Sequence, residues 1–435
     1  MTTYPEKKAY RFSIKRFLVL LGLILLGGIS LGATTLPAQS QGSFPRAALT
    51  PQLYMPLVYA NRAVTSSYVV LGWNDLGMHC YNRNFQDIAV LPPYNNLWAQ
   101  VIQRGDPPVI VTQGVRVQYS FPDNTTSSNK SNFWQYANKL FNVNLPDNMG
   151  LKGKGLAGVM DPQSGYFVAE GIPLTEFSDS APTTAAPYQQ AVIVAKDSAT
   201  GTTLASLTVV APVSTEMHCD YCHASGKEPG GNQARVELNI LAYHDREEGT
   251  NLMNQTPVLC ANCHASNALG MLGNPSLPSL SKAMHSKHSG EVSNTLDGCY
   301  SCHPGPTTKC LRDVMSQNVT SSIDPTRKMN CIDCHGTMQK VSQNPDPWRN
   351  EPRCDTCHTA TPTRDYTQNQ ALYRHSTGHG GVYCEACHDS THAIATSREP
   401  ADAIKFIQLQ GHNGTLSTCT VCHLTQPTGK GPHEK

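Results

Sequence analysis

The chain has 435 residues, enough for about two domains, and its 33 Lys and Arg residues nearly balance its 32 Asp and Glu residues. No basic stripe runs along the sequence, so its composition gives no support for nucleic acid as a partner. The 16 cysteines are unevenly spread, because all but one of them follow residue 218. We therefore expect the two parts of the chain to differ in their chemistry.

Residues 1–40 have the pattern of an export signal. Basic residues between Lys7 and Arg16 precede an apolar run from Phe17 to Gly32, and small and polar residues follow it. The run is short for a membrane-spanning helix, which needs about 20 residues. We expect export with cleavage, for instance within 38–40, and the alternative is an uncleaved N-terminal anchor as the membrane contact. Cleavage removes five basic groups and one acid, which takes the formal charge from +1 to −3.

Residues 41–66 carry three prolines without a clear period and are interpreted as a linker. From 67 to 213 the pattern is mostly that of strands. Residues 115–121 alternate apolar and polar, and two runs rich in β-branched residues, 191–195 and 204–210, flank a turn at 197–201 as in a hairpin. Residues 132–143 have helical spacing of apolar side chains. The sequence predicts a small, mainly-β domain with one or two helices over 67–213.

One five-residue phrase, CxxCH, occurs seven times in the rest of the chain. The copies are CDYCH (219–223), CANCH (260–264), CYSCH (299–303), CIDCH (331–335), CDTCH (354–358), CEACH (384–388) and CTVCH (419–423). Two thiols one helical turn apart can each form a thioether to a porphyrin, and the histidine that follows can bind the iron, which is the attachment signature of c-type haem. Zinc sites need pairs of CxxC units around one metal, and this gives no reason for the repeated histidine. The sequence predicts seven covalently bound c-type haems.

The motifs define the expected attachment points and proximal iron ligands. The cysteines are Cys219, Cys222, Cys260, Cys263, Cys299, Cys302, Cys331, Cys334, Cys354, Cys357, Cys384, Cys387, Cys419 and Cys422. The proximal histidines are His223, His264, His303, His335, His358, His388 and His423. The segments between motifs vary in length and have few apolar runs, so we expect porphyrin faces to supply apolar surface. The sequence predicts an irregular heptahaem cytochrome c domain over 214–435, with short helices and little other secondary structure.

Ten histidines lie outside the motifs, enough to give each of seven irons a second imidazole. An iron held by two imidazoles has no open position, so it transfers electrons without binding substrate. His285 and His288 are expected on one face of a short helix. The favoured distal candidates are His244, His285, His288, His379, His392 and His412. His79 and His218 compete for the seventh place ahead of His375, and we expect His433, near the C-terminus, to be exposed to solvent.

Two cysteines, Cys80 and Cys310, lie outside the motifs. In an oxidising compartment two such cysteines suggest a disulfide, which here would tie the N-terminal half to the haem half. Two separate buried thiols are the alternative.

The motif set resembles the multihaem c-type cytochromes over roughly residues 214–425. Stretches such as GCYSCHPGPTTKCL and GHGGVYCEACHDSTH are similar to exported heptahaem and octahaem electron carriers, and LGWNDLGMHC (71–80) is similar to the start of a module found ahead of such regions. The resemblance implies closely spaced, mostly bis-histidine haems. Some relatives form extracellular filaments in which a histidine of one subunit ligates a haem in the next, which leaves self-assembly into an oligomer or filament open here.

The leading hypothesis is an electron-transfer protein, not an enzyme, exported to the periplasm, the cell surface or the medium. Its partners would be redox proteins, a quinol-oxidising membrane complex or an extracellular electron acceptor. The alternative is a multihaem oxidoreductase with one five-coordinate catalytic haem for nitrogen or sulfur oxyanions. Some reductases of this kind carry lysine in place of the motif histidine, and no CxxCK occurs in this sequence.

Overall fold

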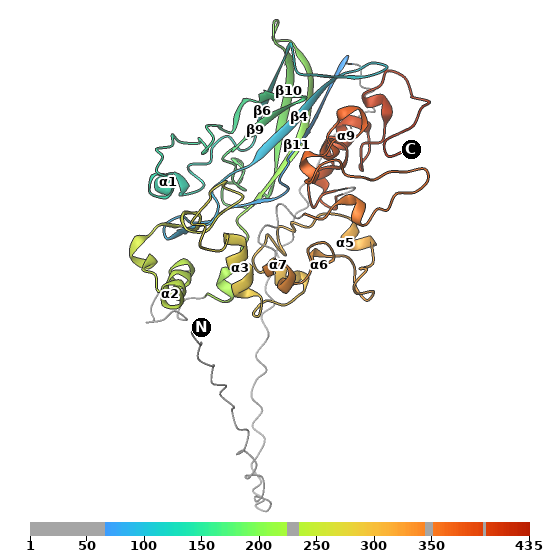
Figure 1. Cartoon of the computed structure of the whole chain (residues 1–435). Helices are drawn as coiled ribbons and strands as arrows, with labels where there is room; N and C mark the ends of the chain where they lie inside the picture. Colours follow the sequence, from blue (N-terminus) through green and yellow to red (C-terminus); the bar gives the residue numbers. More distant parts are fainter. Residues whose placement is uncertain (1–65, 224–234, 344–350, 395–396) are drawn as a thin grey trace, which may run out of the picture. The chain divides into compact units, whose positions relative to one another are not determined.

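The computed structural model of the chain describes residues 66–223, 235–343, 351–394 and 397–435 (Figure 1). The predicted export signal at 1–40, and all but the last residue of the predicted linker at 41–66, lie outside the described residues. A β-rich part from Tyr68 to Ser214 comes first, and a part with short helices follows it. This order confirms the predicted sequence of a mainly-β region and a region poor in regular structure.

Two five-stranded sheets form most of the β-rich part. In the first sheet the order is β1 (Tyr68–Trp73), β4 (Asn96–Gln103), β9 (Tyr166–Glu170) and β8 (Asp161–Gln163), and β5 (Val109–Val111) pairs with β4. In the second sheet the order is β2 (His79–Cys80), β11 (Thr203–Ser214), β10 (Tyr188–Asp197), β6 (Val115–Ser120) and β7 (Ala157–Val159). A shorter pair joins β3 (Ile88–Ala89) to β12 (Val258–Leu259) in parallel. The strand pairing therefore extends to the residue directly before the second motif.

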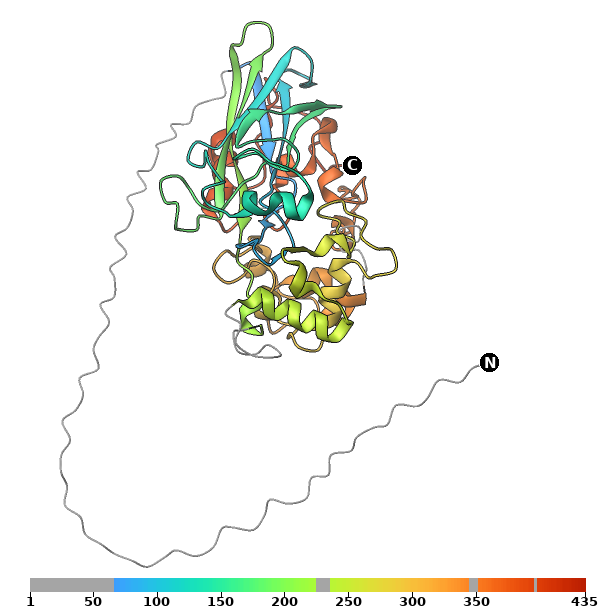
Figure 2. The ribbon, with the colours of Figure 1, turned by 90° about the vertical axis from the view of Figure 1, so that its left-hand side faces the viewer.

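The strands and the helix that the sequence predicts in this part are confirmed. Strand β6 covers 115–120, and β10 and β11 pair antiparallel around the predicted turn, where Asp197 Oδ1 accepts hydrogen bonds from the amides of Ala199 and Thr200 at 3.0 and 2.8 Å. Figure 2 shows this hairpin as the long green strands. Helix α1 (Phe133–Phe141) occupies the segment with helical spacing. Local pattern alone was sufficient for these elements.

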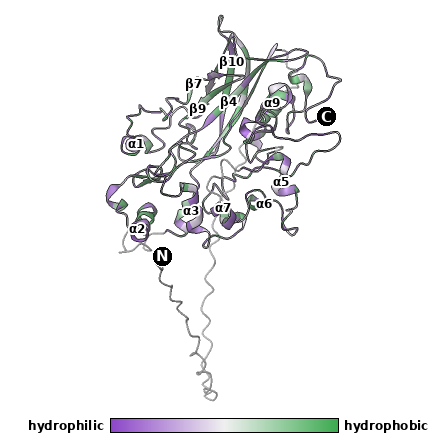
Figure 3. Ribbon diagram, viewed as in Figure 1, coloured by the Kyte–Doolittle hydropathy of each residue, from purple (hydrophilic) through white to green (hydrophobic). Residues whose placement is uncertain are grey.

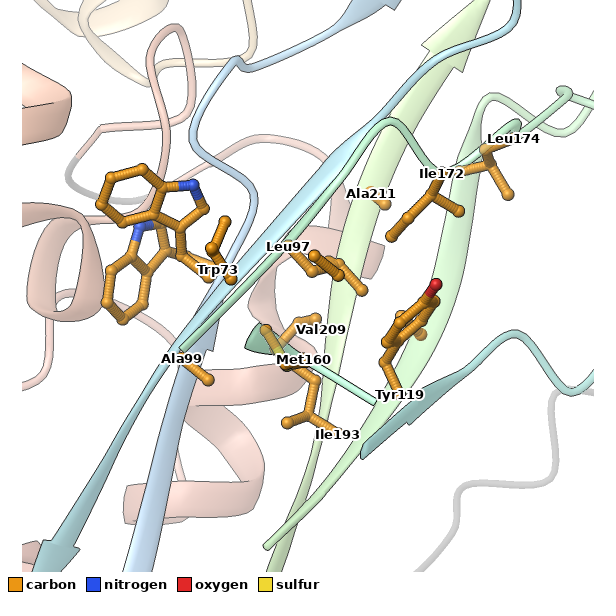
Figure 4. Close-up of a cluster of buried hydrophobic side chains, with 14 of the residues drawn as sticks. Trp73, Leu97, Ala99, Tyr119, Met160, Ile172, Leu174, Ile193, Val209 and Ala211 are labelled. Carbon is orange, nitrogen blue, oxygen red and sulfur yellow. The ribbon is translucent and has the colours of Figure 1, made fainter. Parts of the chain in front are cut away.

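A hydrophobic core lies between the two sheets. Leu97 comes from the first sheet, whereas Ile193 and Val209 come from the second, and all three are buried and lie together in Figure 4. Burying an aliphatic side chain of this size stabilises a fold by roughly 1.5–3 kcal/mol. The core extends to Ala386 and Val421, which belong to the sixth and seventh motifs. The sheets and part of the motif region therefore share one hydrophobic core.

The remaining helices are short. The α-helices are α2 (Val236–Glu248), α3 (Leu280–His288), α4 (Leu296–Tyr300), α5 (Met315–Asn318), α6 (Cys331–His335), α7 (Met338–Gln343), α8 (Cys384–His388) and α9 (Ile404–Gln410). The 3₁₀ helices are η1 (Cys219–Tyr221), η2 (Leu252–Gln255), η3 (Cys260–Asn262), η4 (Cys354–Thr356), η5 (Tyr373–His375), η6 (His379–Gly381), η7 (Pro400–Ala403) and η8 (Cys419–Val421). Helices α3, α5 and α7 bury no residue and carry hydrophilic surface in Figure 3. Their own side chains therefore form no core of the usual kind.

Polar contacts join the last third of the chain to the sheets. The amide of Thr208 on β11 donates to Gln408 Oε1 on α9 at 2.8 Å, and the amide of Tyr383 donates to Gln100 Oε1 on β4 at 3.0 Å. The ring of Trp98 lies 5.4 Å, centroid to centroid, from that of Tyr383, which directly precedes the sixth motif.

Across the described ranges, no helix is both long and apolar enough to cross a membrane.

Candidate metal centres

Each CxxCH motif lies on a single helical turn. In the motifs that begin at Cys219, Cys260, Cys299, Cys354 and Cys419, the histidine amide donates to the carbonyl of the first cysteine at 2.8 to 3.0 Å. Residues three and four apart share one side of such a turn, so both thiols and the imidazole point the same way. The cysteines are free thiols, and the second cysteine is exposed in five motifs. The turn therefore presents two thiols and one imidazole on one side, where a common ligand can contact all three.

Six of the seven motif histidines face a second histidine that lies outside the motifs. The pairs, with the distance between ring centroids, are His223 with His288 (6.2 Å), His264 with His244 (6.4 Å), His303 with His285 (6.1 Å), His335 with His392 (6.2 Å), His388 with His433 (5.9 Å) and His423 with His379 (6.1 Å). A metal–nitrogen bond to imidazole is about 2 Å long, and the nitrogen lies about 1 Å from the centre of its ring. Two imidazoles on opposite sides of one metal would therefore have ring centroids roughly 6 Å apart. The pairs match the separation that a shared metal requires.

Hydrogen bonds at Nδ1 fix the orientation of several of these rings. His285 and His288 on α3 donate from Nδ1 to the carbonyls of Ser281 and Met284, both at 2.8 Å. His264 and His433 donate in the same way to the carbonyls of Pro278 and Asp365, at 2.9 and 3.0 Å. Because a carbonyl can only accept, Nδ1 carries the proton and the Nε2 lone pair stays available. Metal-binding histidines are typically held by a hydrogen bond of this kind.

Burial keeps several paired imidazoles in the neutral form that a metal binds. Burial, together with the positive charge of neighbouring histidines, lowers the pKa of His303 and of His388 to about 4 and that of His392 to about 3. Burial likewise lowers the pKa of His335. A neutral imidazole has a free lone pair, so these four rings are ready to act as ligands at neutral pH.

Two of the distal candidates use Nε2 for other contacts. His79 Nε2 lies 3.1 Å from the carbonyl oxygen of Pro92, and His218 Nε2 lies 3.2 Å from Glu216 Oε1. The ring of His218 also stacks on Tyr221, with centroids 4.5 Å apart. The structure brings neither ring to a motif histidine in the regions it describes.

His412 and His433 behave differently from what the sequence suggests. His412, a favoured candidate, is exposed and donates from Nδ1 to the carbonyl of Asn413 at 2.9 Å, with no motif histidine among its ring contacts in the described chain. His433 is exposed as expected, yet its ring faces His388. The C-terminal segment folds back, because the amide of Asp365 donates to the carbonyl of His433 at 2.8 Å. No local sequence pattern signals this return of the chain.

His358 of the fifth motif has a tyrosine, and not a second histidine, beside it. All 17 histidines lie within the described residues, and none of them makes a ring contact with His358 there. The ring of Tyr366 lies 5.7 Å from that of His358 and 5.4 Å from that of His433. His375, the remaining candidate, contacts Trp98 with centroids 6.0 Å apart. The fifth motif therefore differs from the other six.

Cysteines of different motifs lie close enough for their charges to interact. Burial and then the charge of Cys302 raise the pKa of Cys219 to about 11, and burial and then Cys354 raise the pKa of Cys384 to about 12. A hydrogen bond with Cys331 lowers the pKa of Cys299. The charge of Cys357 likewise contributes to a raised pKa at Cys334, and the charge of Cys422 to a raised pKa at Cys387, in both cases after burial. The first motif is thus next to the third, and the third to the seventh follow one another in space.

The two cysteines outside the motifs are free thiols in the structure. They are neighbours, because burial and then the charge of Cys310 raise the pKa of Cys80 to about 11. The sulfur of Cys310 also lies 3.6 Å from Nδ1 of His392. The structure therefore brings the two residues together, as the disulfide hypothesis requires, without a bond between them.

Within the described segments, no group of three or more His, Cys, Asp or Glu side chains is arranged to hold a metal ion. The imidazole pairs are two-ligand sites, so a metal between them needs further ligands from another source. Comparison of the chain with family models, curated proteins and solved structures finds no match.

Proposed function

We propose that the chain is an exported c-type cytochrome that binds seven haems covalently and transfers electrons along them. The observation that carries the proposal is the set of six imidazole pairs, each with one motif histidine and centroids 5.9 to 6.4 Å apart. A porphyrin supplies four nitrogens in a plane, which is what a two-imidazole site lacks. The paired thiols beside each imidazole supply the attachment points.

Haem iron, when bound, cycles between the ferrous and ferric states, and the protein's part is to hold and tune it. The motif turn offers two thiols for thioether bonds and one imidazole for the proximal position. The second imidazole would be the other iron ligand, and the carbonyls that accept from Nδ1 of His264, His285 and His288 keep these rings oriented. Two imidazole ligands leave no position for a substrate, which favours electron transfer over catalysis.

The arrangement of the motifs supports a path through the chain. The cysteine neighbours join the first motif to the third, and then the third to the seventh in order. The second motif joins this series at α3, which carries the partners of the first and third motif histidines. His264 of the second motif donates to the carbonyl of Pro278, two residues before α3 begins. The predicted export signal and the thioether chemistry point to a location outside the cytoplasm, with redox proteins or an extracellular acceptor as partners.

Haem content and ligand state of the purified protein test the proposal. We expect a mass increase of seven haems that survives denaturation, and the spectrum of low-spin iron from most of them. Replacing both cysteines of one motif, Cys260→Ala with Cys263→Ala, should remove one haem and leave six. A mature protein without covalently bound porphyrin would refute the proposal.

The fifth motif favours a second candidate function, that of an oxidoreductase with one open haem. The ring of His358 contacts that of Tyr366, and no histidine within the described residues makes a ring contact with it. A haem there would have an open or weakly held sixth position, which is where a small oxyanion or gas binds. Carbon monoxide should then bind to one reduced haem in seven, and Cys354→Ala with Cys357→Ala should abolish this binding. No carbon monoxide binding to the reduced protein would exclude this second function.

A further inference from the structure

Residues 104–106, the turn after β4 in the β-rich part of the chain, form hydrogen bonds with the seventh motif. Arg104 Nη2 donates to the carbonyl of Thr420 at 2.8 Å, and the amide of Gly105 donates to the carbonyl of Cys422 at 3.3 Å. His423 donates from Nδ1 to Asp106 Oδ1, at 3.3 Å. Three consecutive residues of one turn therefore contact the backbone of the motif and its ligand ring.

Asp106 is also held in place by Thr425, which follows the seventh motif by two residues. The amide and the hydroxyl of Thr425 both donate to Asp106 Oδ2, at 3.0 and 2.8 Å. This leaves Oδ1 for the imidazole. The carboxylate is thus fixed from one side and directed at His423 from the other.

The partner of His423 differs in charge from the partners seen at other motif histidines. His223 donates to the neutral side-chain oxygen of Asn239 at 3.1 Å, and His264 donates to the carbonyl of Pro278 at 2.9 Å. A carboxylate is a stronger acceptor than either, and it increases the electron donation of the imidazole to a bound metal. Stronger donation stabilises the oxidised metal and lowers its reduction potential.

We propose that Asp106 is a positioning residue through which the β-rich part lowers the reduction potential of the seventh haem. The inference rests on the proposed function and adds to it a role for the region without motifs. Because the seventh motif ends the series of neighbouring motifs, a lowered potential there makes this end of the path the stronger electron donor. Electrons would leave the seventh centre toward the sixth.

A redox titration of the fully loaded protein tests this role with Asp106→Asn. The amide keeps the shape of the side chain and removes its charge, so one midpoint potential of seven should rise and the other six should stay. Thr425→Val should raise the same potential by a smaller amount. The valine removes the hydroxyl that donates to Asp106 Oδ2, so the carboxylate is held less firmly against His423. Asp147→Asn, an exposed site that removes the same charge, is the matched control and should leave all seven potentials unchanged.

Assignment of the shifted centre completes the experiment. In a protein that also carries Cys419→Ala and Cys422→Ala, the seventh haem is absent and the effect of Asp106→Asn should disappear. Seven unchanged potentials in Asp106→Asn, or an equal rise in the Asp147→Asn control, would overturn the inference while leaving the proposed function intact. Absence of covalent haem from the unsubstituted protein would instead overturn the proposed function itself.

Discussion

The imidazole of His392 lies 6.2 Å from that of His335, although His392 follows the sixth motif by four residues and His335 ends the fourth. His392 therefore faces the histidine of the fourth motif and not that of the sixth motif, which is next to it in the sequence. Its backbone has φ of 65°, in the left-handed region, which is uncommon outside glycine. The backbone at His392 thus has an unusual conformation at the position where its ring contacts that of His335.

Replacing His392 should change one centre alone. In His392→Ala we expect seven haems by mass, with one of them converted from low-spin to high-spin because its distal imidazole is lost. Electron paramagnetic resonance of the oxidised protein measures this conversion. His412→Ala is the matched control, since His412 is exposed and faces no motif histidine in the described chain. An unchanged low-spin spectrum in His392→Ala would contradict the pairing.

The C-terminal segment should be needed for the sixth centre. His433 faces His388 at 5.9 Å and is held by its hydrogen bond to the carbonyl of Asp365. We expect His433→Ala to produce one high-spin haem, and Cys384→Ala with Cys387→Ala to remove that signal together with one haem. His375→Ala serves as the control. A high-spin signal that survives loss of the sixth haem would assign His433 elsewhere.

If the protein is exported as proposed, Cys80 and Cys310 should form a disulfide, because an oxidising compartment acts on two neighbouring thiols. Peptide mapping without reductant should recover the two cysteines in one linked species. Cys80→Ser should release Cys310 as a thiol that an alkylating reagent modifies after denaturation. Recovery of both cysteines as free thiols from the untreated protein would support the alternative of separate thiols.

Asp313 should make stability depend on pH in the acid range. Burial raises the pKa of this carboxyl to about 7, and one of its oxygens has no hydrogen-bond partner in the structure. Above pH 4 the unfolded chain releases a proton that the folded chain retains, so the free energy of unfolding should fall as pH rises from 4 to 7. The fall is roughly 4 kcal/mol at most, since each pKa unit corresponds to about 1.4 kcal/mol.

Asp313→Asn should make the fall between pH 4 and pH 7 smaller, because an amide does not titrate, and the part that remains comes from other buried carboxyls with raised pKa values, such as Asp75 and Glu385. Chemical unfolding at pH 4 and pH 7 measures the difference. Asp324→Asn is the control and should keep the slope of the unsubstituted protein between pH 4 and pH 7, because hydrogen bonds from Thr326 lower the pKa of Asp324. An equal slope in Asp313→Asn would show that other groups cause it.

The sequence predicted the features that depend on local pattern. Alternation identified β6, the turn chemistry of Asp197 identified the hairpin, and the motif spacing identified one helical turn at each CxxCH. His285 and His288 lie on one short helix, as expected from their spacing.

Features that depend on distant contacts have no signal in the local sequence. His79 and His218 have suitable side chains, but Pro92 and Glu216 occupy their Nε2 atoms. His433 acquires a motif partner because the C-terminal segment turns back along residues 363–365. The contact of Asp106 with His423 spans most of the folded chain and leaves no trace in local composition.

Helix α3 carries two imidazoles that face different motif histidines, His285 toward His303 and His288 toward His223. Both rings are fixed to carbonyls of the same helix, so they move as one rigid piece with its axis. A movement that tilts α3 would therefore change both histidine pairs together. The first and third motifs are therefore coupled through α3, so a change at one motif that moves this helix also affects the other motif.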